Sequence, residues 1–271
     1  MRLPQSAVRI LFCAFLILAN LGFSACWRRG AKKELVVAGS TSVQPFADRW
    51  SEIYMTKYPG KVVNVQGGGS SAGVQAVRSG AADIGTSSRE LKADEKDLTE
   101  IVVAKDGLAV IVHPSNSVSD LTIDQVKQIF AGKIRSWKEF GGRTKAITVV
   151  TREEGSGTRG AFQEMVMGKI RVFKGAIVED SNGTVREIVA GDPDSIGYIS
   201  LGLVNEAVKA LKLDGVIPTY ENILENRYRL VRPFLFVTKG PAGFEAKDFI
   251  DFVLSAEGQD LIKKEGLIPV R

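Results

Sequence analysis

Residues 146–160 read AITVVTREEGSGTRG, and this stretch decides the fold. Its first part, 146–151, is a β-branched run of the kind that forms a buried strand. The apolar residues within 161–166 have the spacing of one face of a helix. The sequence therefore predicts a strand, a short turn rich in glycine and hydroxyl groups, and the start of a helix.

The turn at 152–160 has the features of a site for a small oxyanion. The first turn of a helix leaves backbone N–H groups free and carries the positive end of the helix dipole. Glycine lets an anion approach the backbone closely, and hydroxyl groups add donors. Arg152 supplies a planar fork of donors that fits an oxyanion. We therefore expect this turn to form half of an oxyanion site.

Three more clusters of Gly, Ser and Thr follow predicted strands, at 39–42, 67–71 and 85–88. Strands and helices alternate along the chain, which predicts an α/β fold with mainly parallel sheets. In such sheets, ligands bind beyond the carboxyl ends of the strands. The clusters therefore converge if they line one cleft.

Other segments give simpler expectations. Residues 93–100 are expected to form a helix with a solvated, charged face, and 245–265 a single final helix followed by Gly266. Aromatic residues at helical spacing are expected in the core. These are Trp50, Phe130 and Phe252.

Length and composition are those of an ordinary globular protein with two lobes. The chain has 271 residues, of which 44% are hydrophobic and 25% charged. The formal charge of +5 falls to +3 once Arg2 and Arg9 are left out with residues 1–25. Because this charge is small and dispersed, we expect no nucleic-acid partner.

Residues 1–25 resemble a bacterial signal peptide of the lipoprotein type. A basic start, a short apolar core and small residues precede Cys26. The apolar run is shorter than the roughly 20 residues that a membrane-spanning helix needs. Phe23 replaces the usual leucine of the lipoprotein cleavage box, so plain secretion or an uncleaved anchor stays open. We expect a lipid on Cys26 and a basic tether over 26–33.

Residues 69–73, GSSAG, fit the G-x-S-x-G pattern of serine esterases, with Ser71 as nucleophile. The base would have to be His113, the one histidine of the chain. The third member would be Asp94, Asp97 or Asp106. This order compresses the triad into about 40 residues, and no backbone oxyanion motif is evident. We therefore favour a capping or surface role for His113 and expect no enzyme. One histidine and one cysteine after processing also predict no metal and no cofactor.

Several segments, taken together, resemble the phosphate-binding proteins of bacterial ABC phosphate importers. They are 38–45 (AGSTSVQP), 66–74 (QGGGSSAGV), 82–89 (ADIGTSSR) and 152–159 (REEGSGTR), and 180–183 and 196–202 fit as well. The resemblance runs from about residue 34 to 271. It implies a two-lobed periplasmic-binding-protein fold, type II-like, with the ligand in the interlobe cleft and two crossover strands.

The same resemblance divides the chain. Gly107–His113 and Arg232–Thr238 look like the crossovers. Lobe I would then hold 34–111 plus 238–271, and lobe II would hold 112–237.

Carried over residue by residue, the resemblance implies phosphate contacts from both lobes. The residues are Thr41, Ser42, Ser70, Ser88, Arg152, Ser156, Gly157 and Thr158. Many family members have an aspartate at the place of Ser88, which accepts the proton of hydrogen phosphate and repels sulfate. Ser88 can accept that proton but lacks the charge, so sulfate or molybdate stays open as the ligand. Arg89 is either a second positive group at the cleft or a surface arginine.

The implied function is that of an extracytoplasmic solute-binding protein that captures inorganic phosphate and delivers it to the membrane permease of an ABC importer. We expect a monomer, held at the periplasmic or outer face of the cell membrane by lipidated Cys26. Because both lobes supply donors, the anion would favour a closed state.

Overall fold

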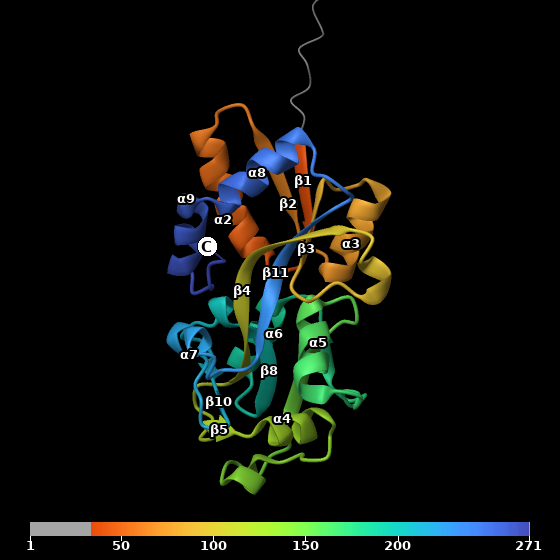
Figure 1. Ribbon diagram of the computed structural model, residues 1–271. Helices are drawn as coiled ribbons and strands as arrows, with labels where there is room; N and C mark the ends of the chain where they lie inside the picture. The colour runs from red at the N-terminus through yellow and green to blue at the C-terminus, as the bar shows by residue number, and fades with distance from the viewer. Residues whose placement is uncertain (1–33, 271) are drawn as a thin grey trace, which may run out of the picture. The chain divides into compact units, whose positions relative to one another are not determined.

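The structure is a computed structural model that describes residues 34–270, so the predicted signal segment, Cys26 and the whole tether lie outside the described residues. The strands of the main sheet are β1 (Glu34–Gly39), β2 (Val62–Gln66), β3 (Ile84–Ser87), β4 (Thr99–Val112), β6 (Thr148–Arg152), β7 (Ile177–Glu179), β8 (Ser195–Ser200), β9 (Lys209–Ala210) and β11 (Val231–Thr238). They follow the order β2-β1-β3-β11-β4-β8-β6-β7, with β9 paired to β4 (Figure 1). A small second sheet pairs β5 (Asp120–Leu121) with β10 (Lys212–Leu213).

The helices connect and cover these strands. They are α2 (Gln44–Lys57), α3 (Ser70–Ser79), α4 (Ile123–Phe130), α5 (Gly157–Phe162), α6 (Asn182–Gly191), α7 (Tyr220–Leu224), α8 (Phe244–Leu254) and α9 (Ala256–Lys264). Shorter turns of helix are η1 (Ala93–Glu95), η2 (Trp137–Phe140), η3 (Gln163–Met167) and η4 (Leu201–Leu203). Among the described residues, none of these helices has both the length and the apolar character that a membrane crossing requires.

The expectation of mainly parallel pairing is correct for the two ends of the sheet and wrong for its middle. At one end β1 pairs in parallel with β2 and β3, and at the other β6 pairs in parallel with β7 and β8. In the middle β11 runs antiparallel to β3 and β4, and β4 runs antiparallel to β8. The reason is that β4 and β11 pass between the two ends in opposite directions (Figure 1).

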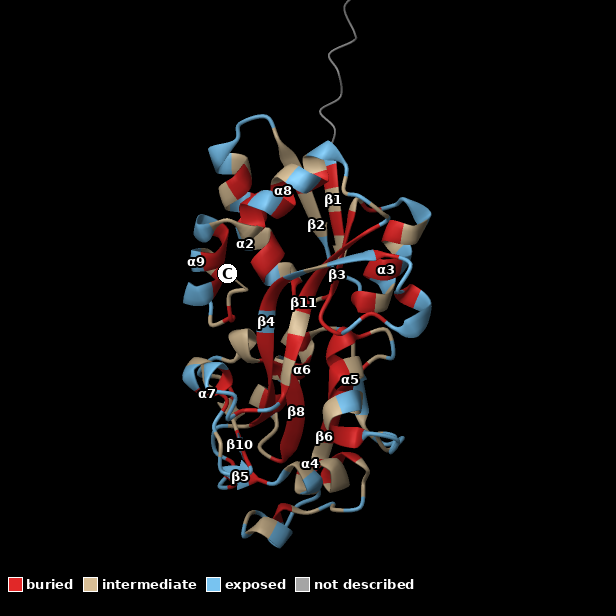
Figure 2. Ribbon diagram, in the orientation of Figure 1, coloured by how far each residue is buried: buried red, intermediate tan, exposed pale blue. Residues whose placement is uncertain are grey.

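Each end of the sheet has its own apolar core (Figure 2). One core gathers β1, α2 and α8 with residues up to Ala104 on β4 and from Phe234 on β11. The other gathers α4, η2 and β8 with residues from Leu108 to Leu230, and Ile268 joins it from the C-terminal segment. Trp50, Phe130 and Phe252 are 0%, 0% and 6% exposed, which confirms their predicted place in the cores.

Two predicted helices are wrong. The charged segment 93–100 is helical only over η1, because a largely β-branched run draws the chain into β4 from Thr99. The final helix is two helices, because Ser255 adopts an extended conformation and its hydroxyl caps α9 by accepting a bond from Gly258 N. Gly266 follows α9 at a φ of +81°, a conformation that glycine adopts readily after a helix end.

Candidate functional site

The hydroxyl-rich turns meet where the two ends of the sheet face each other. The turn after β1 carries Ser42, Ser70 begins α3, and Ser88 follows β3. From the other end, Arg152 closes β6 and Thr158 lies in the first turn of α5. Each of these side chains is 0–1% exposed. The turns therefore form one buried polar cluster, which we call the hydroxyl cluster.

Contacts between the two ends hold the hydroxyl cluster together. Ser42 Oγ lies 2.7 Å from Thr158 Oγ1, and Arg152 Nη2 donates to Thr41 Oγ1 at 3.2 Å. A Cβ added at Gly157 would lie only 2.1 Å from Ser70 Oγ. Residue 157 therefore has to be glycine for the two turns to come this close.

The remaining predicted residues line the same cluster. Ser88 N donates to Ser70 Oγ at 3.1 Å, and Ser40 Oγ donates to Ser88 Oγ at 2.9 Å. Ser156 caps α5, since its hydroxyl accepts a bond from Arg159 N at 3.2 Å. The structure thus brings together all eight residues that the resemblance implies, and adds Ser40 to them.

The guanidinium of Arg152 is fixed on two of its three nitrogens. Nε donates to Glu153 Oε2 and to the Glu179 carbonyl, both at 3.1 Å, and Nη2 donates to the Asp180 carbonyl at 2.7 Å. Nη1 is buried and has no hydrogen-bond partner among the described residues. Burial lowers the pKa of Arg152, and the charge of Glu153 opposes that shift. An anion beside Nη1 would supply the missing acceptor and a counter-charge.

Sequence reasoning missed a second buried guanidinium at this place. Arg232 on β11 stands opposite Asp106 on β4 in the strand register, and its Nε and Nη2 donate to Asp106 Oδ2 at 3.0 and 2.9 Å. Nη1 donates to the Ser88 carbonyl and Nη2 to Ser42 Oγ, both at 3.2 Å. The available signal was weak: Arg232 is the one charge of β11, whereas β4 carries Glu100 and Lys105 besides Asp106.

Asn182 was missed as well. It begins α6, is 1% exposed, and its Nδ2 donates to Ser42 Oγ at 2.9 Å. Its Oδ1 accepts a bond from Ser200 N at 3.2 Å, which fixes the orientation of the amide.

Comparison with known proteins places the chain in a family. The model of a PBP superfamily domain matches residues 28–257. The chain belongs to the PBP superfamily. It is 34% identical to the phosphate-binding protein PstS of Bacillus subtilis, over 100% of this chain and 95% of the relative.

Solved structures of this superfamily agree with the fold. A substrate-binding protein from Clostridium perfringens, described as that of a phosphate ABC transporter with bound phosphate, is 44% identical, with a TM-score of 0.86 over 88% of this chain and 100% of the other. An ABC-type phosphate transport receptor from Vibrio cholerae is 38% identical, with a TM-score of 0.72 over 86% of this chain and 99% of the other. The two-lobed, type II-like PBP fold with β4 and β11 as crossover strands is therefore confirmed.

Arg89 fits neither role that the sequence left open. Its side chain is 7% exposed and donates to both carboxylate oxygens of Glu95, at 2.7 and 2.9 Å. It is thus a buried, neutralised cation beside the hydroxyl cluster, and Glu95 is not part of a solvated helix face.

The nucleophile and the base of the esterase hypothesis, Ser71 and His113, make hydrogen bonds to other residues and not to each other. Ser71 Oγ accepts a bond from Arg89 Nη2 at 3.3 Å. His113 Nδ1 lies 2.7 Å from Ser115 Oγ, at the far end of β4. No group of three or more potential metal-ligating side chains lies within residues 34–270.

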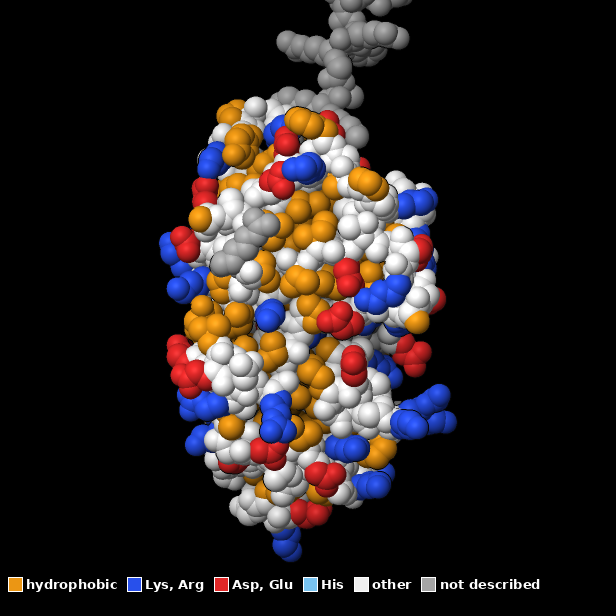
Figure 3. All heavy atoms as spheres, in the orientation of Figure 1, with side chains coloured by type: hydrophobic (Ala, Val, Ile, Leu, Met, Phe, Trp, Pro, Cys, Tyr) orange, Lys and Arg blue, Asp and Glu red, His pale blue; other side chains and the backbone are white. Residues whose placement is uncertain are grey.

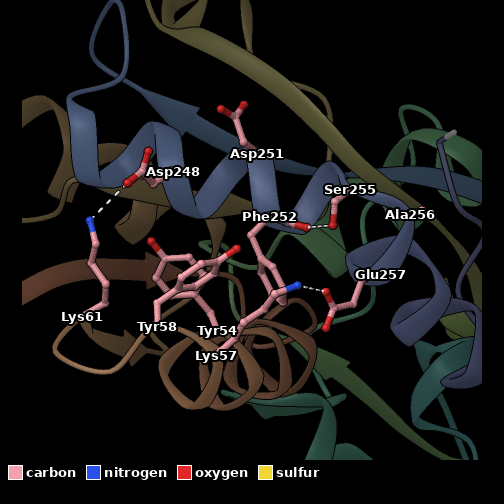
Figure 4. A pocket seen from close by; sticks show the side chains of 10 residues that line it. All are labelled: Tyr54, Lys57, Tyr58, Lys61, Asp248, Asp251, Phe252, Ser255, Ala256 and Glu257. Carbon is pink, nitrogen blue, oxygen red and sulfur yellow. Dashed lines mark hydrogen bonds and ion pairs between the residues drawn. The ribbon is translucent and has the colours of Figure 1, made fainter.

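A hollow of about 560 Å³ lies away from the hydroxyl cluster, between α2 and the junction of α8 with α9 (Figure 4). Tyr54 and Phe252 line it, and its two lysines form ion pairs, Lys57 with Glu257 and Lys61 with Asp248. Basic and acidic side chains are also interspersed over the face in Figure 3. Both lysines of the hollow are therefore paired, and neither offers a buried donor without a partner like Nη1 of Arg152.

Proposed function

We propose that this protein is an extracytoplasmic solute-binding protein that captures inorganic phosphate and delivers it to an ABC importer. The observation that carries the proposal is the buried Nη1 of Arg152, which lies within a cluster of hydroxyl groups and has no hydrogen-bond partner in the described part of the chain. Relatives that span nearly the whole chain are named as phosphate-binding proteins, which supports phosphate as the anion.

The proposed contacts come from both lobes. They are Thr41, Ser42, Ser70, Ser88, Arg152, Ser156, Gly157 and Thr158. An anion that leaves water loses its hydration, which costs at least several kcal/mol unless other donors replace it. Each hydrogen bond to a charged group returns about 1.5–3 kcal/mol. Hydroxyls, backbone N–H groups and Arg152 would together replace the lost hydration.

Closure follows from this division of donors. The proposed lobes are 34–111 plus 238–271 and 112–237, and the hydroxyl cluster forms only where they meet. An anion that bonds to both sides binds the closed arrangement more tightly and shifts the population toward it. A permease that contacts both lobes would then distinguish the loaded protein from the empty one. Attachment to the membrane through Cys26 and a monomeric state remain part of the proposal.

Calorimetric titration of the purified protein with inorganic phosphate tests the function directly. We expect saturable binding with one phosphate per chain. Absence of binding by a folded protein, checked by its circular dichroism spectrum, would contradict the proposal.

A second oxyanion is the alternative, and Ser88 is the observation that favours it. The side chain at this position carries no charge to repel fully ionised sulfate, and its recorded hydroxyl partner within residues 34–270 is Ser40. Competition of sulfate and molybdate against phosphate, at one pH below and one above neutrality, separates the two. Displacement of phosphate by equimolar sulfate would assign the site to the other anion.

A further inference from the structure

The hydroxyl of Ser42 is the point where both lobes and a crossover strand meet. It contacts Thr158 Oγ1 at 2.7 Å, Asn182 Nδ2 at 2.9 Å and Arg232 Nη2 at 3.2 Å. Ser42 is 0% exposed, so water does not reach this hydroxyl from the surface. The three contacts must therefore account for its hydrogen bonding.

The chemistry of the partners fixes the direction of each bond. A serine hydroxyl has one proton and two lone pairs, whereas an amide nitrogen and a guanidinium nitrogen only donate. Asn182 and Arg232 therefore occupy both lone pairs of Ser42. The proton of Ser42 can then go only to Thr158 Oγ1, so a contact of Ser42 with the anion would come from its backbone N–H and not from its hydroxyl. Thr158 in turn cannot donate to Ser42, so its own proton remains for another acceptor.

We propose that Arg232, held in place by Asp106, is a positioning residue of the anion site: with Asn182 it makes Ser42 donate to Thr158, so that Thr158 donates to the bound anion. This inference rests on the proposed function. Arg232 thereby serves the site without having to touch the anion.

The surroundings of Arg232 hold its guanidinium in the orientation that donates to Ser42. Asp106 is 0% exposed, and Ser200 Oγ donates to its Oδ1 at 2.8 Å, so the carboxylate that holds Arg232 is itself fixed. Burial lowers the pKa of Arg232, the attraction of Asp106 opposes that shift, and the charge of Arg152 adds to it. An anion between these two arginines would relieve their mutual repulsion.

The test has to separate positioning from the general stability of a buried ion pair. Removing Arg232 alone would leave Asp106 buried and unpaired, which is strongly destabilising. We therefore choose the paired variant Asp106→Asn/Arg232→Met, since replacing both members of a buried pair is often neutral. In this variant Ser42 has a free lone pair, and Thr158 can donate to it instead of to the anion. We expect phosphate to bind about tenfold more weakly, the effect of one hydrogen bond to a charged group.

Thr158→Val shows whether the effect passes through Thr158. This change removes the hydroxyl and keeps the shape of the side chain. If Arg232 acts by positioning, the paired variant causes no further loss of phosphate affinity in the Thr158→Val background. If Arg232 attracts the anion only through its charge, the losses add, and the inference is wrong. An unchanged affinity of the folded paired variant would also overturn it.

A second variant guards against failure of the paired variant to fold. Asn182→Ala frees the other lone pair of Ser42 without breaking the ion pair, so we expect the same loss and the same lack of additivity with Thr158→Val. The control is Arg89→Met/Glu95→Gln, which removes the other buried pair near the cluster, whose guanidinium bonds Ser71 and not Ser42. Its phosphate affinity should stay within about twofold of the parent. If the unchanged protein binds no phosphate, the proposed function fails; if it binds and the variants bind equally, only this inference fails.

Discussion

Replacing Arg152 by methionine should weaken phosphate binding by one to two orders of magnitude. Nε and Nη2 are held by protein acceptors, so these bonds position the guanidinium whether or not an anion is present. Nη1 alone is buried without a partner among residues 34–270. The effect on binding therefore comes mainly from Nη1 and from the charge.

The magnitude follows from one bond. A hydrogen bond to a charged group contributes about 1.5–3 kcal/mol, and about 1.4 kcal/mol changes a dissociation constant tenfold. Loss of the Nη1 bond should thus raise the Kd for phosphate about 10- to 150-fold. The partner carboxylate of Glu153 has a side chain that is 32% exposed, so it can turn to water when the arginine is gone. Loss of the fold is therefore not the expected result.

Isothermal titration calorimetry with inorganic phosphate measures the change, and thermal unfolding checks the fold. The matched control is Arg49→Met, the same substitution at an exposed arginine of α2 that pairs with Glu52. It changes the net charge equally and should leave the Kd within about twofold. An Arg152→Met protein that is folded and binds phosphate as tightly as the control would refute the assignment of Arg152 to the site.

Three further changes test other parts of the structure. Gly157→Ala should weaken phosphate binding more than about tenfold, because its Cβ would meet Ser70 Oγ and force the lobes apart; calorimetry measures it, and parental affinity would contradict it. For Glu95, burial alone would raise the pKa, but bonds from Arg89 and Lys92 N lower it below its ordinary value, so its stabilising effect is present above about pH 4.3 and is lost as the pH falls through the folded value. Denaturant unfolding at descending pH should therefore show that the free energy of unfolding falls less in Glu95→Gln than in the parent. An equal fall in both proteins would argue against the pairing of Glu95 with Arg89. Tyr228→Phe removes the hydroxyl that donates to the Leu108 carbonyl at 2.8 Å, and should lower the free energy of unfolding by about 1–2 kcal/mol. Urea unfolding measures this change, and an unchanged free energy would contradict the prediction.

Much of the candidate site could be predicted from the residue types of its turns and from their positions after strands. Each hydroxyl-rich turn lies within a few residues of a strand end. Because β1, β2 and β3 are parallel and end at the same edge, residues 39–42, 67–71 and 85–88 could be brought together from sequence alone. The turn at 155–158 follows β6, which runs in the opposite direction, and it meets the other turns because the two ends of the sheet face each other. The role of Ser156 as the cap of α5 follows from its own turn, whereas Gly157 is required by the approach of Ser70 from the other side of the cluster. The turn chemistry is local in sequence and could therefore be predicted, whereas the contacts between the turns are not local.

Arg232 and Asp106 could not be assigned in the same way. They are 126 residues apart, and they face each other only because β4 and β11 pair antiparallel in one particular register. A shift of one residue would place either charge on the opposite face of the sheet. Similarly, the charged run at 93–100 indicated a solvated helix, and only the three-dimensional position of Arg89 shows why Glu95 is buried.

The residue at position 88 determines how strongly the site can discriminate between hydrogen phosphate and sulfate. In the hydroxyl cluster the carboxylate of Asp106 is occupied by Arg232 and Ser200, so it does not serve as an acceptor for the anion. Ser88 Oγ has two lone pairs, of which one accepts the bond from Ser40. One lone pair is left to accept a proton of hydrogen phosphate, and sulfate at neutral pH has no such proton to donate. Discrimination at this position is therefore worth about one neutral hydrogen bond, roughly 0.5–1.5 kcal/mol, whereas a carboxylate would add repulsion of the dianion. The two buried arginines favour any oxyanion, so the preference for phosphate over sulfate should be small compared with the affinity itself.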